Sequence, residues 1–277
     1  MKNIKKTGVL VLVLAFVLAL CTACGGSGDT GAEEDKTIKV AATPSPHAEI
    51  LYQVKDALAE EGWTLEVIEF EDYVKPNQAV TDGDCDANYF QHQPYLDSYN
   101  AENGTDIVSA GVIHYEPLGV YKGTKDAFEA LEEGDKIGVP ADATNEGRAL
   151  QLLAAEGVIT LQDGLTLDQT TKESIVDNPY NIEIVELEAA ALPASLPDLA
   201  LAVINGNYAI GAGLTADNAI AYESTDSEAA QTFANIIACA KGNETSEKIT
   251  ALVAALQTAA VKDFIDATYD GAVQAMF

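Results

Sequence analysis

Short apolar segments that alternate with an amphipathic stretch constrain the fold of this chain more than any other feature. Residues 38–42 (IKVAA) predict a short strand, and residues 48–61 carry apolar side chains at helical spacing. Residues 65–70 predict the next strand. This order is typical of a βαβ unit, which places the two strands parallel in one sheet.

The same pattern returns later in the chain. Residues 136–140 predict a strand, residues 145–156 a helix, and residues 182–187 another strand. Residues 199–204 form a nearly continuous apolar run, which is typical of a buried parallel strand. Residues 245–277 show helical spacing. Two α/β units of similar size predict two lobes.

Open α/β sheets bind ligands beyond the carboxyl ends of their strands. We therefore expect a cleft between the lobes. The segments expected at this cleft are the loops 43–47, 71–78, 88–95, 141–148 and 205–208.

The N-terminus predicts export. Residues 1–23 begin with three Lys and continue in an apolar run from Val9 to Leu20, which is typical of a secretory signal peptide. This run is shorter than the roughly 20 residues that span a bilayer, so a transmembrane anchor is the weaker alternative.

A lipid anchor is predicted at the end of this signal. Small Ala23 precedes Cys24, as at a bacterial lipoprotein cleavage site, whereas bulky Leu20 precedes the competing Cys21. Cys24 would carry the lipid, palmitate included, and residues 24–36 would form a flexible acidic tether.

Composition excludes several functions. The formal net charge is −29, which disfavours nucleic acid as a partner. The three His have no zinc spacing, and no P-loop, GxGxxG or GxSxG motif is present, so we expect no metal, no cofactor and no enzyme activity.

Cys85 and Cys239 are expected to be buried thiols, since two residues are a weak basis for a disulfide.

Arg148 is the one Arg of the chain, which otherwise uses Lys. A guanidinium forms two parallel bonds with a carboxylate, and the start of a helix adds a dipole that favours an anion. Arg148 is therefore a candidate for binding a ligand carboxylate. The alternative is a structural ion pair with one of the 44 acidic residues.

Five further residues are candidates for the same site. Asn145 and Asn205 offer both donors and acceptors, which suits a zwitterion, although Asn145 could also cap a helix and Asn205 could occupy a turn. Phe90, His92 and Tyr95 could enclose a side chain, and ordinary core packing is the alternative for the two aromatic residues.

Four segments together resemble the methionine-binding lipoproteins of ABC importers, the NlpA-type lipoprotein family. They are ATPSPHAEIL (42–51), FEDYVKPNQAVTDGDCDANYFQHQPYLD (70–97), VPADATNEGRAL (139–150) and NPYNIEIVELEAAALPASLPDLALAVINGNYA (178–209). The resemblance covers nearly all of residues 37–277. It weakens across residues 206–245, where Asn207 and Cys239 have no clear counterpart.

The resemblance implies a two-lobed periplasmic-binding-protein fold of type II that closes around one free amino acid. Lobe one would hold residues 37–116 and 219–277, and lobe two residues 117–218. The implied roles are Arg148 for the carboxylate, Asn145, Asn205 and Asn235 as polar partners, and Tyr73, Phe90, His92 and Tyr95 as the side-chain pocket.

The implied function is capture of methionine outside the cytoplasm by a protein anchored in the cell membrane. The partners would be an ABC permease and its ATPase subunits. The alternatives within this fold are another apolar amino acid, D-methionine or a short peptide, and a surface hydrolase or adhesin is the alternative from a different class.

Overall fold

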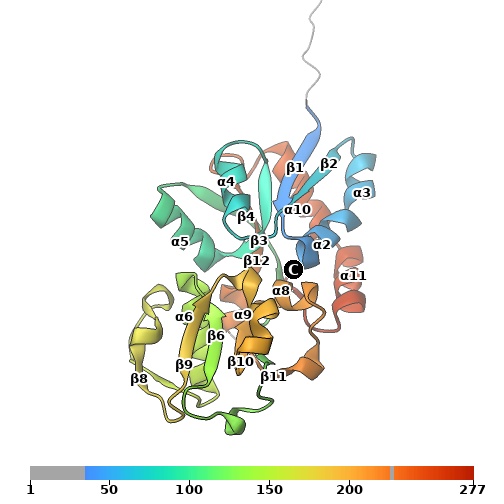
Figure 1. The fold of residues 1–277 in the computed structure, drawn as a ribbon. Helices are drawn as coiled ribbons and strands as arrows, with labels where there is room; N and C mark the ends of the chain where they lie inside the picture. The colour runs from blue at the N-terminus through green and yellow to red at the C-terminus, as the bar shows by residue number, and fades with distance from the viewer. Residues whose placement is uncertain (1–34, 225–227) are drawn as a thin grey trace, which may run out of the picture. The chain divides into compact units, whose positions relative to one another are not determined.

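The computed structural model describes residues 35–224 and 228–277, and Figure 1 shows their arrangement as a ribbon. The strands are β1 (Thr37–Ala42), β2 (Thr64–Glu69), β3 (Ala87–His92), β4 (Ile107–Tyr115), β5 (Gly119–Lys122), β6 (Lys136–Pro140), β7 (Thr160–Leu161), β8 (Ile175–Asp177), β9 (Glu183–Leu187), β10 (Leu201–Ile204), β11 (Ala219–Tyr222), β12 (Asn235–Ala240) and β13 (Gln274–Ala275).

Helices connect most of these strands. The α-helices are α2 (Glu49–Gln53), α3 (Lys55–Glu60), α4 (Lys75–Thr81), α5 (Gln93–Asn103), α6 (Ala143–Ala155), α7 (Leu192–Ser195), α8 (Gly206–Gly211), α9 (Glu228–Thr232), α10 (Glu247–Leu256) and α11 (Ala259–Tyr269). The shorter turns are a π-helical turn, η1 (Pro44–Ala48), and the 3-10 turns η2 (Phe128–Ala130), η3 (Leu167–Gln169), η4 (Lys172–Ser174), η5 (Ala189–Ala191), η6 (Leu196–Asp198) and η7 (Ala216–Asn218).

Two sheets of similar size organise residues 36–277, which form one compact unit. The first sheet has the order β13-β4-β12-β3-β1-β2, and the second has the order β11-β5-β10-β6-β9. In each sheet the βαβ strands are parallel, while strands that return from elsewhere in the chain pair antiparallel. The fold is the expected α/β type with two lobes, each built on one of these sheets.

Both faces of the first sheet are covered by helices because alternate residues of its strands point to opposite faces. Ile38 and Val40 of β1 pack in a core that includes residues of α2, α3, α10 and α11. Ala41, which follows Val40 and points the opposite way, packs with residues of α4 and α5 on the other face. The second sheet repeats this arrangement, with α6 on one face and α7 and α8 on the other.

The chain crosses between the sheets twice among the described residues. The first crossing, residues 116–118, joins β4 to β5, and the second lies between β11 and β12, where residues 223–224 and 228–234 are described. The sequence analysis ended lobe two at residue 218 and returned the chain to lobe one at residue 219. That boundary is too early, because β11 pairs with β5 and so belongs to the second sheet.

Several expected elements are confirmed, with different boundaries. The strand at 136–140 is β6, and the helix expected at 145–156 is α6, which begins earlier because Asp142 caps it. The helix expected at 48–61 is divided into α2 and α3 at Val54. The loop expected at 88–95 is wrong, since β3 and the start of α5 occupy it.

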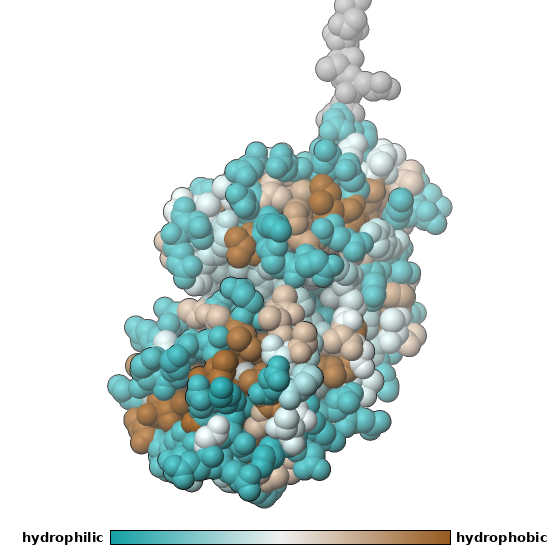
Figure 2. Space-filling model, viewed as in Figure 1, coloured by the Kyte–Doolittle hydropathy of each residue, from teal (hydrophilic) through white to brown (hydrophobic). Residues whose placement is uncertain are grey.

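Cys85 and Cys239 are both buried and free, as expected. The signal peptide at 1–23, Cys24 and most of the tether lie outside the described residues. Within the part that the structure describes, no helix is long and apolar enough to cross a membrane. Figure 2 shows hydrophilic residues over most of the face in view, in keeping with the excess of acidic residues.

Candidate functional site

A small cavity of about 20 Å³, with room for about one water molecule, is lined by residues from both lobes. All eight candidate residues line it, and their role in binding stays a prediction. The full lining is Tyr73, Phe90, Gln91, His92, Tyr95, Glu116, Asn145, Arg148, Asn205, Gly206, Asn207 and Asn235.

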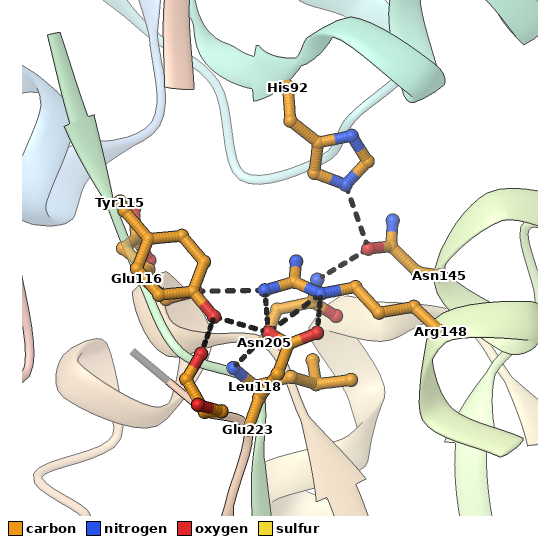
Figure 3. A network of polar contacts seen from close by, with 9 residues as sticks. His92, Tyr115, Glu116, Leu118, Asn145, Arg148, Asn205 and Glu223 are labelled. Carbon is orange, nitrogen blue, oxygen red and sulfur yellow. Dashed lines mark hydrogen bonds and ion pairs between the residues drawn. The ribbon is translucent and has the colours of Figure 1, made fainter. Parts of the chain in front are cut away.

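Arg148 lies on α6 and is 4% exposed. Its Nε donates to both carboxylate oxygens of Glu223, at 2.9 and 3.0 Å, and its Nη2 donates to Glu223 Oε2 and, at 3.0 Å, to the Glu116 carbonyl. Figure 3 shows the guanidinium between Glu223 and the pair of His92 and Asn145. The ion-pair alternative therefore describes one edge of Arg148. The remaining nitrogen, Nη1, bonds to none of the described residues.

The charges of this ion pair stabilise each other. Burial alone would lower the pKa of Arg148, but the bonds and charge of Glu223 raise it above its usual value. Burial likewise would raise the pKa of Glu223, and Arg148 holds it below its usual value. The Phe233 ring lies 4.2 Å from the guanidinium carbon, so an aromatic face also covers the cation.

Asn145 connects the two sheets through its side chain. Asp142 caps α6, and its Oδ1 accepts from the backbone N–H of Asn145 at 3.0 Å and from Nδ2 at 2.8 Å. The cap is thus Asp142, so the cap alternative for Asn145 is wrong. The Oδ1 of Asn145 is left to accept from His92 Nε2 at 3.2 Å and from Asn205 Nδ2 at 2.9 Å.

His92 ends β3 and caps α5, and its hydrogen bonds fix its tautomer. Its Nδ1 accepts from the Tyr95 backbone N–H at 3.2 Å, so Nε2 carries the proton that it donates to Asn145. Burial, with the charge of Arg148, lowers the pKa of His92 to about 3. This side chain is therefore neutral at physiological pH.

Asn205 follows β10 directly and makes no side-chain cap on α8. Asn205 lines the cavity, and because its Nδ2 donates to Asn145, its Oδ1 remains as an acceptor. That oxygen is buried and has no hydrogen-bond partner among the described residues. A buried acceptor without a donor is costly, and such an atom beside a cavity indicates a ligand that donates.

Aromatic side chains form another part of the wall. Tyr73 lies 5.8 Å, between ring centroids, from both Phe90 and Tyr95. The Tyr73 hydroxyl donates to Asn207 Oδ1 at 2.5 Å, which joins the segment before α4 to α8. Phe90 and Tyr95 line the cavity and also pack against each other, so core packing and a pocket are compatible here.

Comparison with known proteins decides the family. The model of the NlpA lipoprotein family matches residues 38–277, which is nearly the whole of the described chain. The chain belongs to the NlpA lipoprotein family. Among its relatives, the methionine-binding lipoprotein MetQ of Bacillus subtilis is 41% identical over 273 residues, covering 96% of both chains.

Solved structures support the assignment of this chain to the NlpA lipoprotein family. A lipoprotein from Ruminococcus gnavus is 56% identical with a TM-score of 0.86, covering 87% of this chain and 100% of its own. A nutrient-binding protein from Burkholderia cenocepacia, bound to methionine, is 43% identical with a TM-score of 0.82 and the same coverage. The two-lobed fold expected from the sequence is therefore confirmed.

Three buried side chains that are far apart in the sequence or show no metal-site spacing lie together in this NlpA lipoprotein. His47, His114 and Glu116 have their ligand-type atoms within 4.8 Å of one another, the one such group of three among the described residues. Every ring nitrogen of the two His already has a hydrogen-bond partner. The group is therefore a closed hydrogen-bond network, and Asn235 joins it through His47.

The sequence analysis missed five residues of the site. Four of them line the cavity, namely Gln91, Glu116, Gly206 and Asn207, and the fifth, Glu223, holds Arg148. Glu116 and Glu223 lie on the two crossing segments, where an acidic residue in an acidic chain gives no signal. Asn207 lies where the resemblance to the family weakens and has no clear counterpart there.

Proposed function

We propose that this chain is an extracytoplasmic substrate-binding lipoprotein that captures free methionine and delivers it to an ABC import permease. The observation that carries the proposal is the unpartnered Asn205 Oδ1 in a cavity that also contains Arg148. The cavity thus presents a donor for a carboxylate and an acceptor for an ammonium group, which are the two ends of a free amino acid.

The donor end of the cavity supports binding of the ligand carboxylate. Arg148 Nη1 is available there while Glu223 holds the opposite edge of the guanidinium. Asn235 Oδ1 interacts with His47 at 3.0 Å, which leaves its Nδ2 as a second donor. Hydrogen bonds to an ionised group are about twice as strong as neutral ones, so these contacts would dominate affinity.

The acceptor end supports binding of the ammonium group. Glu116 is 6% exposed. Arg148 donates to the Glu223 carboxylate and to the backbone carbonyl of Glu116, so it does not pair with the Glu116 carboxylate. A buried carboxylate gains from a cationic partner. Asn205 Oδ1 supplies a neutral acceptor beside it.

The aromatic wall supports a thioether side chain. Tyr73, Phe90 and Tyr95 surround this part of the cavity, and sulfur makes favourable contacts with aromatic rings. The B. subtilis relative is named for methionine binding, and the B. cenocepacia relative is bound to methionine. Both facts favour methionine over other apolar amino acids.

The proposed activity is capture without chemistry. Cys24 would anchor the chain to the outer side of the cell membrane through its lipid, and the lobes would close on the ligand by hinge motion at the two crossings. The ligand-bound form would then dock on the permease and its ATPase subunits.

Thermal unfolding in the presence of a panel of free amino acids tests the proposed cargo. A ligand at 100 times its dissociation constant stabilises a protein by about 2.7 kcal/mol, so L-methionine should raise the melting temperature by several degrees. D-methionine, leucine and methionine-containing dipeptides are the competitors. A larger shift with leucine or a dipeptide than with methionine would overturn the assignment. Mass spectrometry of ligand released on denaturation gives an independent identification.

A further inference from the structure

Glu116 is a buried carboxylate on the first crossing segment, and its ion-pair partners are unusual. Among the described residues, its partners within ion-pair distance are His47, at 3.4 Å, and His114, at 2.7 Å, both measured to Oε1. Arg148 pairs instead with the carboxylate of Glu223. Glu116 therefore lacks a Lys or Arg partner within the described residues.

The acceptor oxygens at Nε2 of the two imidazoles fix which ring nitrogens carry protons. The Glu116 carboxylate only accepts, so His114 donates from Nε2, and its Nδ1 accepts from the Tyr89 hydroxyl. His47 donates from Nε2 toward Asn235 Oδ1, at 3.0 Å, and its Nδ1 accepts from the Thr43 hydroxyl at 2.7 Å. Each ring is thus held from both sides.

The network supplies hydrogen bonds without supplying positive charge. Burial lowers the pKa of His47 to about 4 and that of His114 to about 3, so both rings are neutral near pH 7. A neutral imidazole orients the carboxylate but leaves its negative charge available to another group. An ammonium group in the cavity is the natural recipient of that charge.

The opposite side of Glu116 is also fixed in position. A Cβ added to Gly206 would lie 2.7 Å from both the Cβ and the Oε2 of Glu116. The start of α8 thus packs directly against the carboxylate. His114 is hydrogen-bonded to Oε1, His47 lies 3.4 Å from the same oxygen, and Gly206 lies near Oε2, so the side chain has little freedom to turn away from the cavity.

We propose that His114 and His47 are positioning residues that hold Glu116 toward the ammonium group of the ligand and thereby select a free α-amine. This inference rests on the proposed function. It adds a source of specificity that lies outside the cavity lining, since neither His lines the cavity. Ligands without the amine would bind equally well whether or not the network is intact.

The test compares affinities for L-methionine and for 4-(methylthio)butanoate, which is methionine without its amine. Isothermal titration calorimetry gives both dissociation constants for the wild type, His114→Leu and His114→Gln. In His114→Leu we expect methionine affinity to fall by about 10-fold or more, because a hydrogen bond to a charged group is lost, while the amine-free analogue keeps its affinity. His114→Gln retains a donor on a long side chain and should restore most of the preference.

The ratio of the two affinities separates positioning from general structural damage. A merely structural role would weaken both ligands in parallel and leave the ratio unchanged, which would overturn the inference. Ile113→Val, next to His114 on β4 and fully buried, is the control that should lower the melting temperature without changing the ratio. If His114→Leu does not fold, His47→Leu and Thr43→Val test the same ratio.

Failure of the proposed function gives a different result. A wild-type chain that binds neither ligand, or binds the amine-free analogue better than methionine, contradicts the proposed function itself. A wild type that prefers methionine, with variants that keep the full preference, contradicts only the positioning role.

Discussion

Glu223 accepts two hydrogen bonds from Arg148 Nε, at 2.9 and 3.0 Å, and a further bond from Nη2. Glu223 lies on the second crossing segment, and Nη2 also donates to the carbonyl of Glu116 on the first crossing. Tyr115 adds a bond from its hydroxyl to Glu223 at 2.6 Å. Arg148 therefore ties α6 to both segments that join the sheets.

Replacing Glu223 by Gln tests the contribution of this ion pair to stability. The change leaves the 4% exposed Arg148 without a counter-charge, so we expect a loss of about 3–5 kcal/mol in the free energy of unfolding. Chemical denaturation measures this loss. Asp266→Asn breaks the exposed pair with Lys262 and serves as control, with an expected change under about 1 kcal/mol. Equal effects of the two variants would contradict the structural role of Glu223.

Replacing Arg148 by Lys tests the guanidinium geometry. Lys keeps the charge but cannot bond to Glu223, to the Glu116 carbonyl and to a ligand carboxylate at once. We expect methionine affinity to fall by about 10-fold or more, measured by calorimetry. The exposed Lys262→Arg is a control that should leave affinity unchanged. Wild-type affinity in the Arg148→Lys variant would remove Arg148 from the ligand site.

The three buried His predict a loss of stability in acid. Burial lowers the pKa of His47 from 6.5 to about 4, and burial lowers the pKa values of His92 and His114 to about 3. Their stabilisation is complete above about pH 6.5 and is lost as the pH falls toward 4 and then 3, because the unfolded chain binds protons first. The lowered pKa of Glu223 acts in the same direction, whereas the raised pKa of Glu116 opposes it.

Each buried His contributes up to about 1.4 kcal/mol per pH unit to this dependence. Urea unfolding at several pH values between about 7 and 4.5 measures the slope. His92→Gln should reduce it by about the contribution of one His. Constant stability between about pH 6.5 and 4.5 would contradict the neutral buried network.

Gly206 offers a steric test of the acceptor end of the cavity. A methyl group at this position would meet Glu116 at 2.7 Å, so Gly206→Ala should displace that carboxylate and reduce methionine affinity by about 10-fold. Gly211, at the other end of α8, has nothing within 4 Å of an added Cβ. Gly211→Ala is therefore a matched control that should keep affinity, and calorimetry of both variants provides the comparison.

The sequence predicted β1, β2, β6, β9 and β10 because these strands are short and rich in apolar residues. It missed β3, whose residues are all buried although Asn88, Gln91 and His92 are polar. Asn77, Asn88 and Gln91 satisfy one another through buried hydrogen bonds, which a hydrophobicity pattern cannot detect.

The site was predictable only in part. The candidates at the ends of strands and in the recognised motifs, Asn235 included, all line the cavity. The partner of Arg148 was not predictable, because Glu223 lies 75 positions away and is one of 44 acidic residues. His47 and Glu116 likewise meet only because the first crossing brings them together.

Calorimetric titration with methionine, N-acetylmethionine and methioninamide tests most directly whether the cavity binds both ends of a free amino acid. Acetylation removes the ammonium that Asn205 and Glu116 would bind, and amidation removes the carboxylate that Arg148 would bind. We predict binding of methionine and a loss of affinity of about 100-fold or more for each blocked form, since buried charged groups would be left unpaired. Comparable affinity for methionine and either blocked form would contradict the account.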